Sequence, residues 1–304
     1  MQAYPTSGQA PKDWQCFPVR QLAHRCKALK QAGPSASRRR EAGPESLRKL
    51  TVQYHGLKTA RYTQKNQGTT MIVLITGATG GYGRALCQQA KDAGHFVIAI
   101  GRSIEKLRKL EELDLTDLHY EIDFLDEDIE EKISNLEHAL IKSNVRTIDL
   151  LINNAGIGSK GSSLFSETAQ NIKDSVSINC VAPFLLSALL LNKFALKTLV
   201  NISSRRGSVE QNADQSVSKK GCSYSYRISK SALNMLSLCI ADEFGDRVAC
   251  YAVHPGRLKT GIGVAEATLE PSCSAKRLFD LVASAPPPNQ FYSLENEQVA
   301  TLPW

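Results

Sequence analysis

Short apolar runs alternate with stretches of helical spacing along residues 71–304. The apolar runs are residues 71–75, 96–100, 118–124, 149–152, 199–202 and 248–253. Such runs are typical of strands that a parallel sheet buries on both faces. Helical spacing covers residues 84–93, 104–113 and 129–141 and longer stretches further on, and Gly94 suits the end of the first helix. The alternation predicts an α/β fold, a doubly wound parallel sheet with helices on both faces.

Residues 1–70 differ from the rest of the chain. They show no sustained period, contain the run Arg38 to Arg40, and hold 13 Lys and Arg against three acids. We interpret them as a disordered basic extension of a single domain spanning residues 71–304. Three interpretations stay open: an organelle transit peptide, a basic tail that contacts an acidic surface, and an upstream extension without function, because Met71 could serve as a start.

That extension accounts for the formal net charge of +7, since residues 71–304 hold 24 basic and 27 acidic side chains. The body therefore lacks the basic footprint of a nucleic-acid-binding protein. The longest apolar stretch, residues 181–191, is broken by Pro183 and Ser187, so no membrane span is expected. The eight cysteines form no C-x-x-C pair and no zinc-like spacing with histidine, which predicts free thiols, no metal site and a cytoplasmic location. An organelle matrix is the alternative if residues 1–70 are a transit peptide.

A glycine-rich turn follows the first predicted strand, in the sequence Thr76-Gly-Ala-Thr-Gly-Gly-Tyr-Gly83. Gly77 would permit the tight turn, Gly81 would let a pyrophosphate approach the backbone, and Gly83 would let the next helix pack against the strand. A helix that opens here presents free N–H groups to phosphates. The turn therefore predicts dinucleotide binding, and the cofactor-binding candidates within it are Gly77, Thr79, Gly81, Tyr82 and Gly83.

In dinucleotide-binding folds, the residue at the end of the second strand contacts the 2′ position of the ribose. An acid there accepts from the 2′-OH of NAD, whereas an arginine suits the 2′-phosphate of NADP. The sequence has Arg102 and no acid, so NADP is favoured over NAD. Asp123, after the third strand, would either position the adenine or cap the next helix.

Tyr226 and Lys230 lie four residues apart in a stretch of helical spacing, and therefore on one helix face. A nearby ammonium group favours the phenolate and lowers the pKa of a tyrosine, which suits it to acid–base chemistry near neutral pH. Ser203 and Ser204 stand at the end of the fifth strand, where parallel sheets bind their ligands.

Together these motifs resemble the short-chain dehydrogenase/reductase superfamily over residues 71–304. The glycine-rich turn, the run Asn153 to Gly156, Ser204 with Tyr226-x-x-x-Lys230, and Pro255-Gly256 followed by Thr260 occur in that family's order. Arg227, residues 232–235, His254-Pro255-Gly256 and the terminal Leu302-Pro303-Trp304 are most similar to the C-factor and sniffer-like carbonyl reductases. The resemblance implies a Rossmann fold and an NADP-dependent reductase of a carbonyl group or dehydrogenase of a secondary alcohol.

The resemblance also implies a role for each matched residue. Tyr226 would be the general acid, Lys230 would lower its pKa and bind the nicotinamide ribose, and Ser204 would hydrogen-bond the substrate oxygen. Asn179 would complete the catalytic set by supporting a water relay to Lys230. The remaining cofactor contacts would come from Asn154, Ala155, Gly156, Pro255, Gly256 and Thr260, with Tyr226 and Lys230. A homodimer or homotetramer would form through the long helices that hold Asn179 and Tyr226.

Two features depart from the family. Residues 207–226 form a longer and more polar stretch than usual, which would either reshape access to the site or form a surface loop. Arg205 and Arg206, next to Ser204, would be solvated or at an interface, with recruitment of an anionic substrate as the alternative. His254 is interpreted as a packed residue at a strand end. The competing function is a dinucleotide-sensing or signalling protein with little turnover, which the intact Ser204, Tyr226 and Lys230 disfavour.

Overall fold

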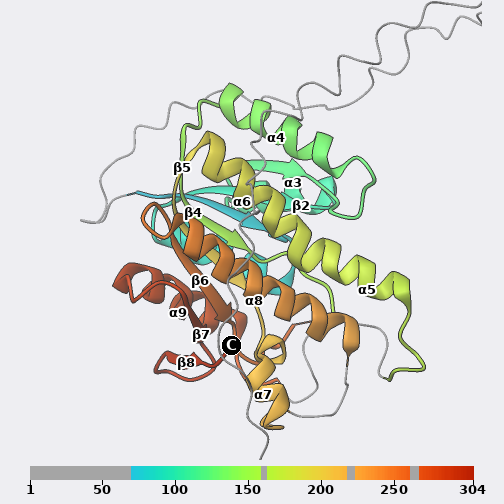
Figure 1. Ribbon diagram of the computed structural model, residues 1–304. Coiled ribbons are helices and arrows are strands. Elements are labelled where there is room, and N and C mark those ends of the chain that lie inside the picture. The colour runs from blue at the N-terminus through green and yellow to red at the C-terminus, as the bar shows by residue number, and fades with distance from the viewer. Residues whose placement is uncertain (1–69, 159–162, 218–222, 261–266) are drawn as a thin grey trace, which may run out of the picture. The chain divides into compact units, whose positions relative to one another are not determined.

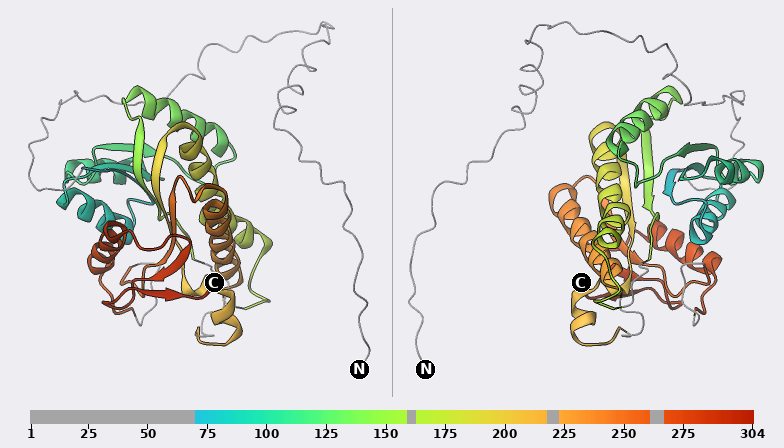
Figure 2. Two further views of the ribbon diagram at one scale, coloured as in Figure 1. Left: turned by 60° about the vertical axis from the view of Figure 1, so that its left-hand side comes forward. Right: turned by 90° about the vertical axis from the view of Figure 1, so that its right-hand side faces the viewer.

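The computed structural model describes residues 70–158, 163–217, 223–260 and 267–304, and these lie in one compact unit (Figure 1). The predicted basic extension falls outside the described residues, except for its last residue, Thr70. The predicted fold class is confirmed by a central sheet with helices on both faces (Figure 2).

One eight-stranded sheet organises the fold, in the order β3-β2-β1-β4-β5-β6-β7-β8. Its strands are β1 (Ile72–Thr76), β2 (Phe96–Gly101), β3 (Leu118–Glu121), β4 (Thr147–Asn153), β5 (Ala195–Ile202), β6 (Ala249–His254), β7 (Gln290–Ser293) and β8 (Ala300–Leu302). Strands β1 to β7 run parallel, and only β8 pairs antiparallel, at the edge. The order reverses at β1, which pairs with both β2 and β4, and this reversal opens a ligand-binding crevice beyond the carboxyl ends of the strands.

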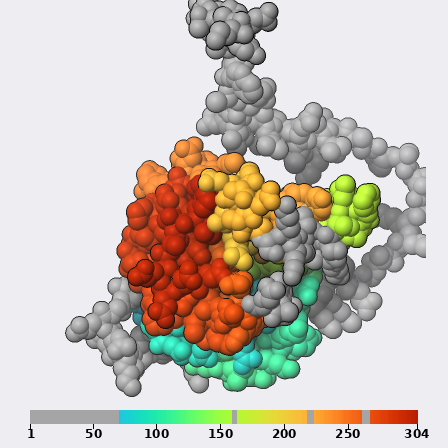
Figure 3. Space-filling view, turned by 90° about the horizontal axis from the view of Figure 1, so that it is seen from below, coloured from blue at the N-terminus to red at the C-terminus, as the bar shows by residue number. Residues whose placement is uncertain are grey.

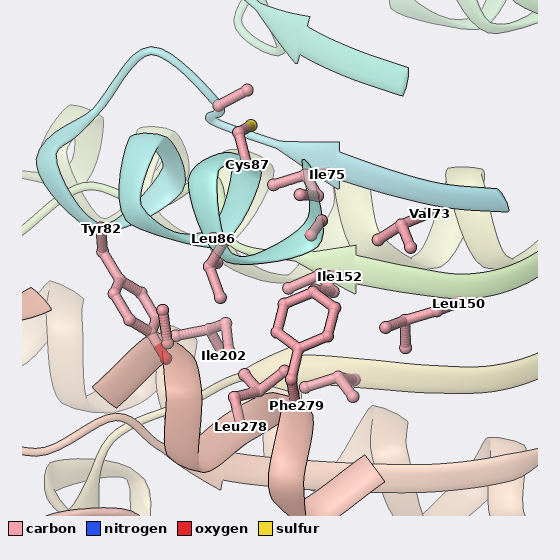
Figure 4. Close-up of a cluster of buried hydrophobic side chains, with 14 of the residues drawn as sticks. Val73, Ile75, Tyr82, Leu86, Cys87, Leu150, Ile152, Ile202, Leu278 and Phe279 are labelled. Carbon is pink, nitrogen blue, oxygen red and sulfur yellow. The ribbon is translucent and has the colours of Figure 1, made fainter. Parts of the chain in front are cut away.

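The helices cover the sheet in two layers. They are α2 (Gly81–Asp92), α3 (Ile104–Glu112), α4 (Ile129–Lys142), α5 (Ala169–Val176), α6 (Ala182–Lys193), α7 (Val209–Ala213), α8 (Tyr224–Phe244) and α9 (Pro271–Ser284), with a π-helix η2 (Ser177–Val181) and a 3₁₀ turn η3 (Arg205–Gly207). One core joins α2, α3 and α9 to the sheet, and Figure 4 shows Leu86 of α2 and Phe279 of α9 in it. The other core joins α4, α6 and α8 to the opposite face. Successive residues of β1 alternate between them, because Val73 and Ile75 face the first core and Leu74 the second.

The six predicted strands and three predicted helices are confirmed with small shifts in their ends. The third strand ends at Glu121 and not at Phe124, and the fifth begins at Ala195. Helix α9 and strands β7 and β8 were not predicted from the sequence. The two strands have four and three residues, too few for a strand period to be visible.

The helical segment Ala169–Lys193 is longer than its apolar run suggested. It joins α5, η2 and α6 into 25 residues that are apolar and long enough to cross a bilayer by length and composition alone. Half of its most apolar window is buried within the protein. Core helices of proteins outside membranes pass the same test, so the segment is weak support for a membrane span.

Candidate active site

A cavity of about 820 Å³ lies at the reversal point of the sheet. Its lining comes from the segments that follow β1, β2, β3 and β4, together with α5 and Thr260. Cavities of a few hundred to a thousand Å³ are typical of cofactor sites. Six of the predicted cofactor residues, from the glycine-rich turn and the end of the second strand, line it: Gly77, Thr79, Gly81, Tyr82, Gly83 and Arg102. Asp123, Asn154, Ala155, Gly156 and Thr260 line it as well.

The glycine-rich turn has the backbone geometry expected of it. Gly77 has a φ of 61°, in the left-handed region, and a Cβ there would lie 2.8 Å from Ala155 Cα. A Cβ on Gly83 would overlap the Gly77 carbonyl oxygen and lie 2.8 Å from Ala78 Cα. The first turn of α2 therefore packs directly on the turn after β1, and its free N–H groups face the cavity region. A Cβ on Gly81 would lie 3.1 Å from Thr260 Cγ2, so a side chain would narrow this side of the site.

Arg102 and Asp123 stand at the ends of β2 and β3. Asp123 accepts a hydrogen bond from the Leu125 N–H at 3.1 Å, so it caps a turn, whereas the N-cap of α4 is Asp128. Lys106, in the first turn of α3, lines the same cavity as Arg102. Lys106 was not predicted from the sequence, although a cation in the first turn of the helix that follows Arg102 could have indicated it.

The run from Asn153 to Gly156 anchors the cavity to β1. The Asn154 side-chain amide donates to the Thr76 carbonyl at 2.9 Å, and the Asn154 and Ala155 N–H groups donate to Thr76 Oγ1 at 3.0 and 2.9 Å. Asn153 points the other way and donates to Asn201 Oδ1 at 2.9 Å inside the protein. Asn153 is thus structural, and Asn154 fixes the wall of the cavity.

Ser204 lies close enough to Tyr226 for its side chain to lower the pKa of Tyr226. Ser204 ends the loop after β5, and its Oγ accepts the Arg206 N–H at 3.2 Å. Tyr226 is the third residue of α8, whose start is held by Glu167, because Glu167 Oε2 accepts from the N–H and the hydroxyl of Ser225 at 3.1 and 2.9 Å. Glu167 is a second residue that the sequence analysis missed, and no motif marked it.

The electrostatics of Tyr226 differ in part from the expectation. Burial raises the pKa of Tyr226, and the Ser204 side chain and the charge of Arg206 act in the opposite direction. The Lys230 Nζ lies 5.9 Å from the centre of the Tyr226 ring, but it donates to the Ile202 carbonyl at 2.7 Å. Arg206 is therefore the cation that lowers the pKa of Tyr226, whereas the Lys230 ammonium group is directed to a backbone carbonyl.

Lys230 and Asn179 converge on Gly156. A Cβ on Gly156 would lie 3.2 Å from Asn179 Oδ1 and 3.6 Å from Lys230 Nζ. Lys230 is 4% exposed, and burial lowers its pKa to about 8. Asn179 sits in η2, where its side chain exchanges two hydrogen bonds with the backbone of Ile157 and donates to Ser229 Oγ at 2.9 Å.

Three predicted cofactor residues also make structural contacts, and their role toward a cofactor stays a prediction. The Tyr82 hydroxyl points toward α9 (Figure 4), where Ser274 Oγ lies 3.0 Å away. Pro255 and Gly256 do not line the described cavity. Gly256 has a φ of 90°, and a Cβ there would lie 2.7 Å from Leu269 Cδ2, so it serves a close chain crossing.

Beside the Ser204 loop lies a charged cluster around Glu295. Its carboxylate pairs with Arg257, lies 3.5 Å from Arg205 and 3.6 Å from His254 Nε2. His254 is 5% exposed at the end of β6, which confirms that it is a packed strand-end residue. Arg205 is thereby half-buried against a carboxylate, not free in solvent.

We expect acid to weaken the fold through Glu295. His254, Arg257 and Arg205 lower the pKa of Glu295 to about 2, so its contribution is present above the unfolded-state pKa of roughly 4.3 and is lost as pH falls toward 2. Glu295→Gln should lower the free energy of unfolding by about 1–3 kcal/mol at pH 7. Between pH 4.5 and 2.5, the free energy of unfolding should fall less in this variant than in wild type. Urea unfolding at several pH values measures this, with the exposed Glu243→Gln as the control. Parallel pH profiles for Glu295→Gln and wild type would contradict it.

The residues present fit a dinucleotide. The N-terminus of α2, with Arg102 and Lys106, would hold its phosphates in the cavity. At Gly156, which lines the cavity, a Cβ would lie 3.2 Å from Asn179 Oδ1, so the absence of a side chain leaves room beside Asn179 and Lys230. No group of three or more His, Cys, Asp or Glu in the described ranges is placed to hold a metal ion.

The chain is similar to known proteins in sequence and in structure. The family model described as short chain dehydrogenase matches residues 71–269. The chain is 30% identical to L-xylulose reductase of Caenorhabditis elegans over 198 residues, 63% of this chain and 73% of that protein. It is 29% identical to C-signal of Myxococcus xanthus over 163 residues, 52% of this chain and 93% of that protein. The NADPH-bound carbonyl reductase from chicken fatty liver has a similar structure, with a TM-score of 0.66, 25% identity, and coverage of 77% of this chain and 99% of that one.

Proposed function

The chain belongs to the short chain dehydrogenase family and is an oxidoreductase, and on that premise we propose that it reduces a carbonyl group with NADPH or oxidises the matching secondary alcohol with NADP. The observation that carries the proposal is the pairing of Tyr226 with Ser204, whose side chain lowers the pKa of the tyrosine, beside the Lys230 and Asn179 side chains that flank Gly156 in the cavity lining. A protein that only binds the dinucleotide has no need of that pair.

The chain's own residues would act on the carbonyl oxygen. In reduction, the Tyr226 hydroxyl donates its proton to that oxygen, and the Ser204 hydroxyl donates a hydrogen bond to it as negative charge develops. The bound nicotinamide supplies the hydride. The Lys230 ammonium group would hold the ribose beside Gly156 and favour the phenolate of Tyr226 once the proton has left.

Asn179 would hold the wall on which the nicotinamide rests. Its two hydrogen bonds with Ile157 and its bond to Ser229 fix the loop after β4 against α8. Any water relay to Lys230 would start from this position, because Asn179 Oδ1 and Lys230 Nζ flank the same Gly156.

Cofactor titration followed by a turnover assay tests the function. Purified protein is titrated with NADPH and NADH, and NADPH consumption is then followed against a panel of aldehydes and ketones. Tight NADPH binding with turnover of one or more carbonyls supports the proposal. The competing function, dinucleotide sensing, is kept because C-signal is among the relatives; tight binding with no turnover across the panel would favour it. Absence of binding to either cofactor would contradict both.

We expect Arg102 and Lys106 to set the preference for NADPH. Arg102→Ala should weaken NADPH binding about tenfold, the cost of one lost charge-assisted pair to phosphate, and leave NADH binding within twofold. Lys106→Ala should have a smaller effect in the same direction. Isothermal titration measures both, and Arg108→Ala, on α3 but outside the cavity lining, is the matched control. Equal losses for NADPH and NADH would contradict the assignment.

We also propose that the chain forms a homodimer or homotetramer through α6 and α8. Phe184 of α6 is 52% exposed, and Ile228 and Met235 of α8 are 46% and 60% exposed. Large apolar side chains gathered on neighbouring helices commonly mark an interface. Met235→Glu with Phe184→Glu should shift the sedimentation coefficient to that of a monomer. A monomeric wild type at micromolar concentration would contradict the proposal.

The cellular location of the protein and the role of residues 1–70 are also proposals. The described cysteines Cys87, Cys180, Cys239, Cys250 and Cys273 are free thiols, which supports a reducing compartment such as the cytoplasm. Deleting residues 1–70 should leave activity and location unchanged if the extension has no function, and should change the location if it is a transit peptide or a membrane- or nucleic-acid-binding tail.

A further inference from the structure

The carboxy-terminal clasp, residues 300–304, lies against the loop that carries Ser204, and the mechanism above gives it no role. Figure 3 shows the red surface of the last residues meeting the gold surface of the α7 region. The clasp begins as β8, whose pairing with β7 places Leu302 opposite Phe291.

The Trp304 ring anchors the clasp on the sheet. It stacks on Phe291 with 5.7 Å between ring centres and 23° between their planes. Phe291 is fully buried, so it offers a fixed surface. The stack therefore determines where the main chain of Trp304 lies.

The Trp304 main-chain oxygen binds the start of α7. It accepts the Glu210 N–H at 3.1 Å and the Ser208 hydroxyl at 3.2 Å. Ser208 is fully buried and is the N-cap of α7. The Ser208 N–H in turn donates to the Arg205 carbonyl at 3.1 Å, which links the clasp to the 3₁₀ turn η3 that Ser204 caps.

The opposite side of η3 is fixed to α8. The Ser231 hydroxyl donates to the Gly207 carbonyl at 2.9 Å, and a Cβ on Gly207 would lie 2.7 Å from the Lys230 carbonyl carbon. Arg227 of α8 donates to Asn212, whose amide donates to the Arg206 carbonyl at 2.9 Å. Thus η3 is held between the helix that carries Tyr226 and Lys230 and the clasp.

We propose that Trp304 is a positioning residue for Ser204, and that the clasp presses η3 onto α8 so that the Ser204 hydroxyl stays against Tyr226. The proposal rests on the proposed function for its effect on catalysis, and on the contacts of residues 204–213 for its physical basis. Trp304 itself touches neither substrate nor cofactor in this scheme.

The test compares Trp304→Ala, Trp304→Phe and a chain ending at Leu302. Trp304→Ala and the shortened chain should lower kcat about tenfold, since small displacements of a catalytic group cost large factors in rate, while the Kd for NADPH stays within twofold. Trp304→Phe keeps a ring for Phe291 and should recover most of kcat. The pH profile of kcat should also shift to higher pH in Trp304→Ala, because Tyr226 loses the Ser204 side chain that lowers its pKa. Thr301→Ala, an exposed change within the clasp, is the control.

Hydrogen exchange of residues 204–213 gives a readout independent of turnover. Exchange should be faster in Trp304→Ala than in wild type while β1 and α2 stay protected. Unchanged exchange in this segment, or a kcat that falls with neither a shifted pH profile nor recovery in Trp304→Phe, overturns the proposal. If wild type reduces no carbonyl, the proposed function fails, and the exchange result alone decides whether Trp304 holds the loop.

Discussion

Tyr226→Phe is expected to lower kcat for carbonyl reduction by about 10³-fold, within the range that a positioned general acid contributes. The ring stays, so the contacts of α8 and the packing around it persist, and only the donor to the carbonyl oxygen is lost. Binding of NADPH should remain within twofold. Stopped-flow or steady-state NADPH consumption with an active carbonyl, together with a binding titration, measures the split between catalysis and binding.

The matched control is Tyr224→Phe, two residues earlier on the same helix and 37% exposed. It makes the same chemical change away from Ser204 and should keep full activity. Retention of more than a tenth of wild-type kcat in Tyr226→Phe would contradict the assignment of the general acid. A further change, Ser204→Ala, should cost less than Tyr226→Phe, since it removes a hydrogen-bond donor and not the proton source.

Gly83→Ala is expected to weaken dinucleotide binding strongly. The added Cβ would meet the Gly77 carbonyl oxygen and would lie 2.8 Å from Ala78 Cα, both of them main-chain atoms that cannot rotate away. The first turn of α2 must therefore move off β1, and its N–H groups lose their alignment with the phosphates. Losing one or two charge-assisted hydrogen bonds predicts NADPH binding weakened by about 100-fold. Overpacking should also cost roughly 1–3 kcal/mol of unfolding free energy.

The Gly94→Ala variant is the control that separates an effect on NADPH binding from an effect on the stability of the fold. Gly94 has a φ of 76°, so alanine there is strained, but no other atom lies within 4 Å of the added Cβ. It lies beyond the far end of α2 from the cavity. Gly94→Ala should lower the melting temperature and leave NADPH affinity unchanged. If Gly83→Ala bound NADPH as tightly as Gly94→Ala, the close packing of α2 on β1 would not be what aligns the cofactor site.

The sequence was most informative at positions where the local backbone geometry permits only one residue type. Gly77 and Gly83 could be assigned from the turn alone, because a left-handed φ and a direct helix–strand contact both exclude a side chain. Tyr226 and Lys230 followed from helical spacing. The apolar runs predicted β1, β2, β4, β5 and β6 because each is buried on both faces.

The sequence was less informative where a position depends on distant partners. Glu167 holds the start of α8 from 58 residues away, and no spacing rule connects them. Gly256 matched a cofactor motif, and its close crossing with Leu269 could not be inferred from that match. The direction of the Lys230 ammonium group toward the Ile202 carbonyl likewise depends on tertiary packing that no local pattern contains.

The π-helix η2 holds one residue more than an α-helical turn of the same rotation would. An α-helix turns by about 100° per residue, so a wider turn absorbs one residue between α5 and α6. Removing one residue from 177–181 would let the helix run on in α-helical register, and α5 and α6 would keep their relative orientation because the wide turn had absorbed that residue. The wall of the cavity that α5 supplies would stay in place. Asn179, which lies in the wide turn, would lose the position from which it reaches Ile157 and Ser229. A change in length here would therefore act on the site through Asn179 and not through the orientation of α5.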